Sequence, residues 1–130
     1  MDRKRVFKTK TFDRWARKVV VDELLCIAAR EIEAGVFEAD LGHGLCKKRI
    51  ATPGHGKRGA VRTLVAKQHS SAIFFLVGRE KSQPGKDFPD SVVSAAKAIA
   101  DSLQTLTPAQ LEELAASGNL KEICSGQKGE

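Results

Sequence analysis

Residues 60–80, AVRTLVAKQHSSAIFFLVGRE, contain two runs that predict neighbouring β-strands. Residues 61–67 predict a β-strand, and His69, Ser70 and Ser71 predict a turn after it. Residues 72–77 are almost wholly apolar, which is typical of a central strand that is covered on both faces. The two runs therefore predict the middle of an antiparallel sheet.

The flanking sequence predicts more strands on both sides of this pair. Residues 6–10 alternate apolar and polar side chains, as a short edge strand does. Residues 36–41 and 45–50 predict a hairpin, because Gly42-His43-Gly44 between them is typical of a tight turn. Residues 119–124 could add a last short strand.

Helical periodicity appears near both ends of the chain. Thr11 is a candidate N-cap for residues 12–18, and apolar residues at helical spacing predict a second helix from Asp22 to a C-cap at Gly35. Residues 92–103 form one apolar stripe, and Thr107-Pro108 opens a shorter helix that Gly118 closes. We therefore expect an α+β domain over residues 1–124, with a small antiparallel β-sheet packed against N-terminal and C-terminal helices. Residues 125–130 are expected to be a disordered tail.

The sequence contains no sign of a membrane segment or a metal centre. No apolar run is long enough to cross a bilayer, and the charged N-terminus leads into no signal core, so we expect a cytoplasmic location. Cys26, Cys46 and Cys124 lie far apart without CxxC spacing, and we expect buried thiols in a reducing compartment. The three histidines form no HxxxH pair, so neither a metal nor another cofactor is expected.

The charge distribution indicates an anionic partner. The formal net charge is +6, and no Asp or Glu occurs between Leu41 and Arg79. The preceding residues 19–40 are instead rich in acids, and we interpret the helix expected there as a solvated acidic face. The acid-free stretch is thus the first candidate for a nucleic-acid interface.

Three motifs in or beside this stretch carry candidate chemistry. Lys47-Lys48-Arg49 places two cations on one face of a strand and one on the other, although lysines also protect a solvated edge strand from aggregation. Residues 53–59, PGHGKRG, form a glycine-rich basic loop that could bind an anion through backbone amides, or could simply be flexible. Gly78-Arg79-Glu80-Lys81 follows the most apolar strand, where a rigid sheet meets a loop, and a plain charged turn is the alternative.

The order of these motifs resembles the RelE superfamily of bacterial type II toxins, more narrowly its HigB-like branch. The resemblance covers roughly residues 6–124, and a Lys-Lys-Arg strand, a Gly-Lys loop and an Arg-bearing strand in that order are its most specific part. The segments that carry it are FKTKTF at 7–12, ADLG at 39–42, GLCKKRIA at 44–51, PGHGKRG at 53–59, RTL at 62–64, residues 74–81 and GNL at 118–120.

This resemblance implies a RelE-like microbial ribonuclease fold and a metal-independent endoribonuclease that cuts mRNA, usually on the ribosome. It also implies a cognate antitoxin, expected to be a helix-turn-helix protein encoded next door. In this scheme Lys47 is a general base, since neighbouring cations disfavour its charged form, while Arg49 and Arg62 hold the phosphate. Either Lys81 or His55 is the acid. The implied catalytic residues are Lys47, Arg49, Arg62 and Lys81, and the implied RNA-binding residues are Lys48, Lys57, Arg58, Arg79 and His55.

One departure from the family pattern bears on the chemistry. Members often carry a tyrosine where this chain has Val77 or Val61, and the chain contains no tyrosine. Trp15 or a phenylalanine could stack on a base instead. Two other functions remain open at this point: a ParE-like DNA gyrase poison from the same superfamily, and a non-enzymatic basic regulator that binds nucleic acid.

Overall fold

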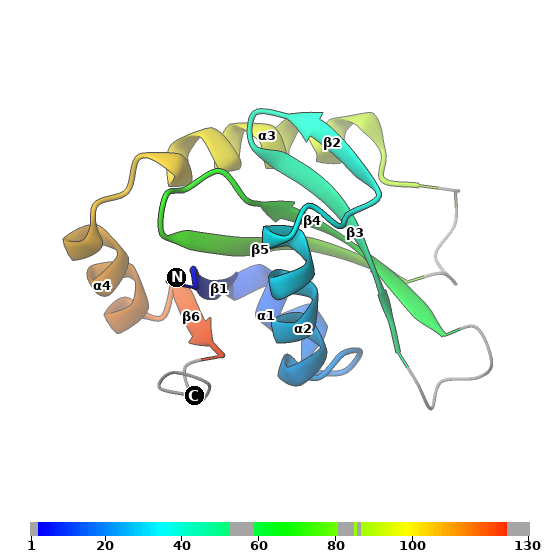
Figure 1. Ribbon diagram of the computed structural model, residues 1–130, viewed down its shortest axis with the longest axis horizontal. Coiled ribbons are helices and arrows are strands. Elements are labelled where there is room, and N and C mark those ends of the chain that lie inside the picture. The colour runs from blue at the N-terminus through cyan, green and yellow to red at the C-terminus, as the bar shows by residue number, and fades with distance from the viewer. Residues whose placement is uncertain (1–2, 53–58, 81–84, 86, 125–130) are drawn as a thin grey trace.

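The structure is a computed structural model that describes residues 3–52, 59–80, 85 and 87–124. Residues 53–58 of the expected basic loop and the tail at 125–130 lie outside the described residues. The α+β class is confirmed (Figure 1). In chain order the elements are β1 (Arg5–Thr9), α1 (Lys10–Ala16), α2 (Asp22–Glu33), β2 (Ala39–Gly42), β3 (Leu45–Ala51), β4 (Ala60–Ala66), β5 (Ala72–Glu80), α3 (Asp90–Gln104), α4 (Pro108–Ser117) and β6 (Leu120–Ile123).

The strands form one six-stranded sheet in the order β2-β3-β4-β5-β1-β6. All neighbouring pairs are antiparallel except β1 and β5, which are parallel. The prediction that residues 6–10 form an edge strand was therefore wrong. β1 lies inside the sheet because β6 pairs along its outer side, and Val6, Phe7 and Lys8 are buried.

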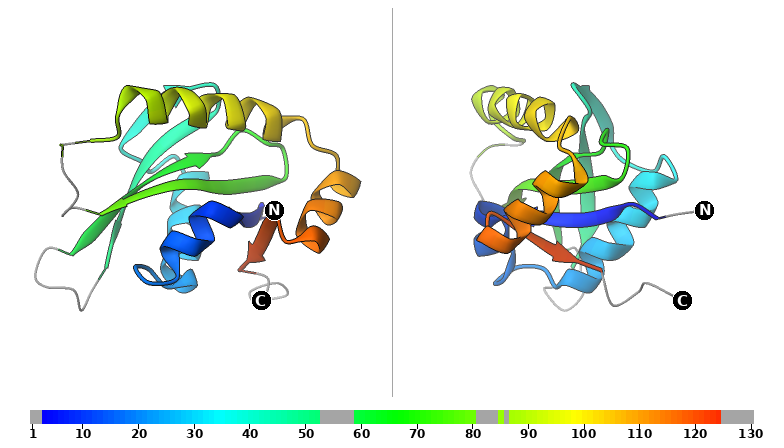
Figure 2. Two further views of the ribbon diagram at one scale, coloured as in Figure 1. Left: turned by 180° about the vertical axis from the view of Figure 1, so that it is seen from behind. Right: turned by 90° about the vertical axis from the view of Figure 1, so that its left-hand side faces the viewer.

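Helices cover both faces of the sheet and divide the core in two (Figures 1 and 2). We call the side that α1 and α2 cover the α2 face, and the side that α3 and α4 cover the α3 face. Val65, Ile73 and Phe75 of the strands pack on the α2 face. Leu64, Phe74 and Leu76 pack on the α3 face. β5 supplies both clusters, which confirms that its apolar run is a strand covered on both sides.

The helix ends differ slightly from those predicted. α1 begins directly after β1, and the Oγ1 atom of Thr9, rather than of Thr11, accepts a hydrogen bond from the Phe12 amide at 3.2 Å. α4 begins at Pro108 behind a capping box between Thr107 and Gln110, and it ends at Gly118 in the left-handed conformation. These caps fix where the chain leaves β1 and where it returns to β6.

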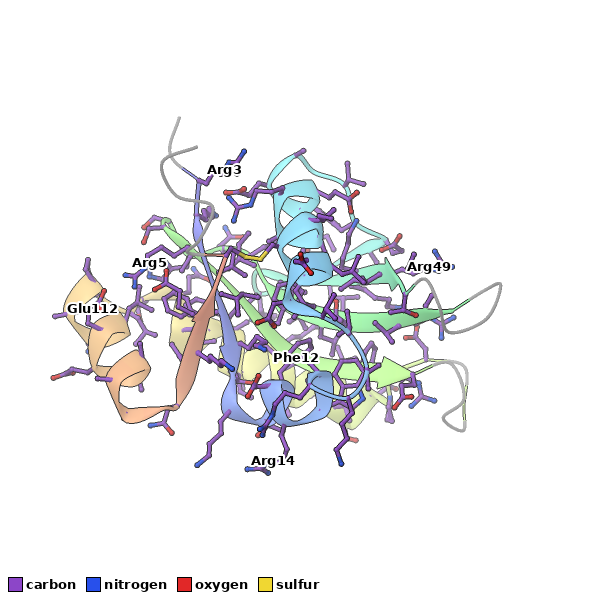
Figure 3. The ribbon with its side chains drawn as sticks, turned by 90° about the horizontal axis from the view of Figure 1, so that it is seen from below. Arg3, Arg5, Phe12, Arg14, Arg49 and Glu112 are labelled. Atoms are coloured by element: carbon purple, nitrogen blue, oxygen red, sulfur yellow. A yellow bond between two sulfur atoms is a disulfide. The ribbon has the colours of Figure 1, made fainter. Side chains whose placement is uncertain are left out.

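A disulfide joins two cysteines that were expected to be thiols. Cys26 in α2 and Cys124 after β6 are bonded, with their Cα atoms 5.7 Å apart and a separation of 98 positions in the sequence (Figure 3). The expectation of three thiols was wrong for this pair, because sequence spacing does not show that β6 returns to α2. Cys46 is a free, buried thiol, and burial raises its pKa to about 12.

The acids of α2 pair with basic groups of the sheet rather than forming a purely solvated face. Asp22 lies 2.7 Å from the Lys8 ammonium, and Glu31 lies 2.8 Å from that of Lys48. Glu33 accepts a hydrogen bond from the backbone amide of Lys4 at 2.8 Å. The acidic side chains of α2 therefore attach this helix to the sheet.

Candidate functional site

Three arginines from three neighbouring strands lie in one row across the sheet. Arg49 of β3 is directly opposite Arg62 of β4, and Arg62 is directly opposite Arg79 of β5. Residues that face each other across antiparallel strands project from the same side of the sheet, and neighbouring strands are about 4.8 Å apart. Lys47 precedes Arg49 by two residues and therefore shares its side. We call Lys47, Arg49, Arg62 and Arg79 the cationic row.

The cationic row lies on the α3 face, near the C-terminal ends of β3 and β5 and the N-terminal end of β4. Leu64 packs in the α3-face core and shares its side of β4 with Arg62, which fixes the face. Figure 3 shows Arg49 at this end and Arg5 at the opposite end. Like charges directly opposite each other destabilise a sheet. The Arg-Arg-Arg row is therefore a candidate anion-binding surface.

The members of the row differ in exposure. The Arg49 and Arg62 side chains are exposed, whereas Arg79 is buried. The Nη2 atom of Arg79 donates a hydrogen bond to the carbonyl oxygen of Gly85 at 3.0 Å. Gly85 has φ +92°, and a Cβ atom there would lie 3.1 Å from that same nitrogen. The buried guanidinium of Arg79 thus adds positive charge beneath the surface, while the side chains of Arg49 and Arg62 reach solvent.

Lys47 contacts a carboxylate that no sequence pattern singles out. The Oδ2 atom of Asp87 forms an ion pair with the Lys47 ammonium, and Oδ1 accepts a hydrogen bond from the Phe88 amide at 2.8 Å. The hydrogen bond from Lys47 holds the pKa of Asp87 below its ordinary value, with further help from the Phe88 amide and the charge of Arg62. Asp87 lies outside the acid-free stretch and in no recognised motif, so only the folded arrangement reveals it.

Lys48 lies on the opposite side of β3 from the cationic row. It is 4% exposed, and its ammonium donates to the carbonyl oxygen of Val36 at 3.0 Å and pairs with Glu31. These contacts occupy Lys48 beneath α2, so the structure does not bring it together with Lys47 and Arg49. The alternation predicted for the Lys-Lys-Arg triplet accounts for this separation.

Four other predicted site residues, His55, Lys57, Arg58 and Lys81, lie outside the described residues. The aromatic candidate Trp15 is described, and its ring packs on Gly78 on the α2 face, where a Cβ atom would lie 2.0 Å from the ring. Val61 is buried on that face as well, while Val77 packs against the α3-face core. Trp15 therefore does not share a face with the cationic row.

A separate hollow of about 640 Å³ lies beside the C-terminal end of α2. It is lined by Arg3, Lys4, Ile32, Glu33, Gly35, Phe37, Lys67, Ser70 and Ile73. Because Ile73 belongs to the α2-face core, this hollow is on the other side of the sheet from the cationic row. Within the described part of the chain, no cluster of three or more His, Cys, Asp or Glu side chains could hold a metal ion. No helix in the same ranges is long and apolar enough to span a membrane.

Comparison with known proteins places the chain in a family. A search of curated proteins found no match. The sequence model of the RelE toxin of the RelE/RelB toxin-antitoxin system matches residues 4–123, which include every described helix and strand. The chain therefore belongs to the RelE family of toxin-antitoxin toxins.

Proposed function

We propose that this toxin blocks translation by cutting mRNA, and that the cationic row binds the phosphate at the cleaved bond. The observation that carries the proposal is the register that aligns Arg49, Arg62 and Arg79 across three strands. A ribonuclease must stabilise the extra negative charge of a pentacoordinate phosphorane, and guanidinium groups do so by bidentate hydrogen bonds. The two exposed arginines are placed to contact RNA directly, with Arg79 adding charge behind them.

The proposed reaction is a transfer within the RNA. The 2′-oxygen attacks the adjacent phosphorus, the bond from phosphorus to the 5′-oxygen breaks, and a 2′,3′-cyclic phosphate and a free 5′-hydroxyl result. A base removes the 2′-proton and an acid protonates the departing 5′-oxygen. We assign the first role to Lys47, once it has left its carboxylate partner, and the second to Lys81 or His55. The cations provide the charge that a metal would otherwise supply, so we propose a reaction without a metal.

The proposed setting is the cytoplasm, with the ribosome presenting the mRNA. Lys57 and Arg58 would position RNA or ribosome by charge, because phosphate contacts orient a nucleic acid without reading its sequence. The RelE/RelB family implies a cognate antitoxin for this chain. We propose that the antitoxin is a helix-turn-helix protein encoded next door, and that it neutralises the toxin by covering the cationic row.

Induction of the protein in cells tests this function against that of a gyrase poison. We expect protein synthesis to stop first, and transcripts to show new 5′-hydroxyl ends inside coding regions. Induction of an SOS response and altered DNA supercoiling with intact transcripts would contradict the proposal. Binding to RNA without cleavage in a translating extract, with or without a chelator, would support only a non-enzymatic regulator.

A further inference from the structure

The carboxylate of Asp87 occupies a position in the cationic row that an anion from outside would need. One of its oxygens contacts the Lys47 ammonium, and the charge of Arg62 reaches it as well. Lys47 is the proposed base and Arg62 a proposed phosphate ligand, so Asp87 must move away from both when RNA binds. This ion pair compensates the charge of Lys47 and occupies one of its three N–H donors, which weakens its attraction for an RNA phosphate. RNA and Asp87 therefore compete for Lys47.

The local structure lets Asp87 leave without disturbing the fold. Its side chain is 47% exposed, while the next residue, Phe88, is 8% exposed and packed in the α3-face core. The backbone is thereby fixed, and α3 begins only two residues after Phe88. Rotation of the Asp87 side chain about its own bonds would release Lys47 and move the carboxylate into solvent. The cost is a partly exposed ion pair and the hydrogen bond from the Phe88 amide, which together are small compared with a buried ion pair.

We propose that Asp87 is a built-in substitute for an RNA phosphate: it holds Lys47 in place in the free toxin and is displaced when RNA binds. This inference deepens the proposed function, because it names the phosphate subsite as the space between Lys47 and Arg62. The exchange makes the toxin discriminate by charge. An isolated weak anion does not displace Asp87, whereas an RNA strand that also contacts Arg49 and Arg62 does.

The test uses an RNA oligonucleotide with 2′-O-methyl groups, which cannot be cleaved, and compares Asp87→Asn with Asp101→Asn. Asp101 is a matched control, because it is also about half exposed and pairs with a basic side chain, His43, at 3.0 Å. Both substitutions raise the net charge by one. Affinity is measured by fluorescence anisotropy at several salt concentrations, in the wild type and in a Lys47→Gln background.

We expect Asp87→Asn to bind the oligonucleotide roughly threefold to tenfold more tightly than Asp101→Asn, in line with one freed surface cation. The slope of log affinity against log salt should steepen by about 0.7, the value for one more phosphate contact with a single strand. In the Lys47→Gln background the advantage of Asp87→Asn should vanish, because the two changes act on one pair.

Equal effects of Asp87→Asn and Asp101→Asn, or an advantage that persists without Lys47, would overturn the inference. A parallel assay measures cleavage of a matched unmodified RNA. It tests the nuclease activity independently of the exchange between Asp87 and RNA. If wild-type protein leaves mRNA intact but Asp87→Asn still binds more tightly, the nuclease proposal fails and the exchange stands. If Asp87→Asn binds as the control does and abolishes cleavage, Asp87 acts in the reaction itself and the exchange is wrong.

Discussion

Lys48 and Arg49 are neighbours in sequence, but the alternation of a β-strand gives them opposite surroundings. Lys48 is buried between β3 and α2, where it meets Glu31 and the carbonyl oxygen of Val36. Arg49 is exposed on the α3 face beside Arg62. Substitutions at the two positions should therefore have separate consequences.

We expect Lys48→Ala to lower the free energy of unfolding by about 1–3 kcal/mol, because a buried carbonyl loses its donor. Arg49→Ala should change stability by no more than about 0.5 kcal/mol, as an exposed substitution does. It should instead weaken RNA binding several-fold and make the salt slope shallower by about 0.7. Urea titration and fluorescence anisotropy measure the two effects. Equal loss of RNA binding in both variants would contradict the two-sided arrangement.

Lys8 is a buried ammonium that holds both helices of the α2 face to β1. Its Nζ atom lies 2.6 Å from Asp13 of α1 and 2.7 Å from Asp22 of α2, and its side chain is 3% exposed. Burial acts to raise the pKa of Asp13, but the hydrogen bond and charge of Lys8 outweigh it and hold that pKa below its ordinary value. The Lys8–Asp13 pair therefore makes the free energy of unfolding depend on pH in the acidic range.

The sign of this linkage follows from the lowered pKa. The stability from Asp13 is fully present above the unfolded pKa of about 3.9 and is lost as the pH falls through the lower folded pKa. We expect Lys8→Met to cost about 3 kcal/mol at neutral pH and to flatten this acid-side loss. Melting temperatures from about pH 2 to 5 measure it. Lys121→Met removes an exposed charge 3.9 Å from the same carboxylate; it is the control and should change the slope much less than Lys8→Met does.

Among the elements, those that depend on local sequence were the easiest to predict. The strand at 45–50, the strand at 72–77 and the helix from Asp22 were confirmed within a few residues, since hydrophobic periodicity is a local property. The position of β1 was not, because its parallel pairing with β5 and its contact with β6 join distant parts of the chain. The Cys26–Cys124 bond was missed for the same reason.

The cationic row could be predicted only in part. Alternation along a strand is enough to put Lys47 and Arg49 on one side of β3, because it depends on the sequence of that strand alone. That Arg62 and Arg79 line up with Arg49 depends on two connections and on the shift in register between Leu64 and Val65 of β4. Turn geometry and loop length set these, and the alternation within one strand does not. Asp87 comes from the segment between β5 and α3.

The disulfide links the segment after the last strand to α2, and it should stabilise the packing of these two elements. A cross-link that closes a loop of about a hundred residues restricts the unfolded chain and can contribute about 4–5 kcal/mol. We expect a reductant to lower the melting temperature of the wild type. Cys26→Ala with Cys124→Ala should melt at that lower temperature with or without reductant. Cys46→Ala should keep the wild-type response, and the absence of any reductant effect would contradict the bond.

In the whole molecule, the two faces of the sheet differ in how their basic side chains are compensated. Acids of α2 compensate the buried lysines of the α2 face, as the pairs of Lys8 and Lys48 show. The α3 face keeps Arg49 and Arg62 exposed at one end, and the net charge of +6 attracts an anionic partner. An antitoxin that covers this end would block RNA without altering the fold.

If RNA is cut at the cationic row, Arg62, at its middle, is the residue on which cleavage should depend most. Purified wild type, Arg62→Ala, Arg62→Lys and the exposed control Arg14→Ala are compared for cleavage of mRNA on programmed ribosomes, with circular dichroism to check folding. We predict that Arg62→Ala lowers the cleavage rate on the order of a hundredfold and Arg62→Lys less, since lysine keeps the charge but loses the bidentate contact. Arg14→Ala should cleave as the wild type does. Undiminished cleavage by folded Arg62→Ala would show that RNA is not cut at the cationic row.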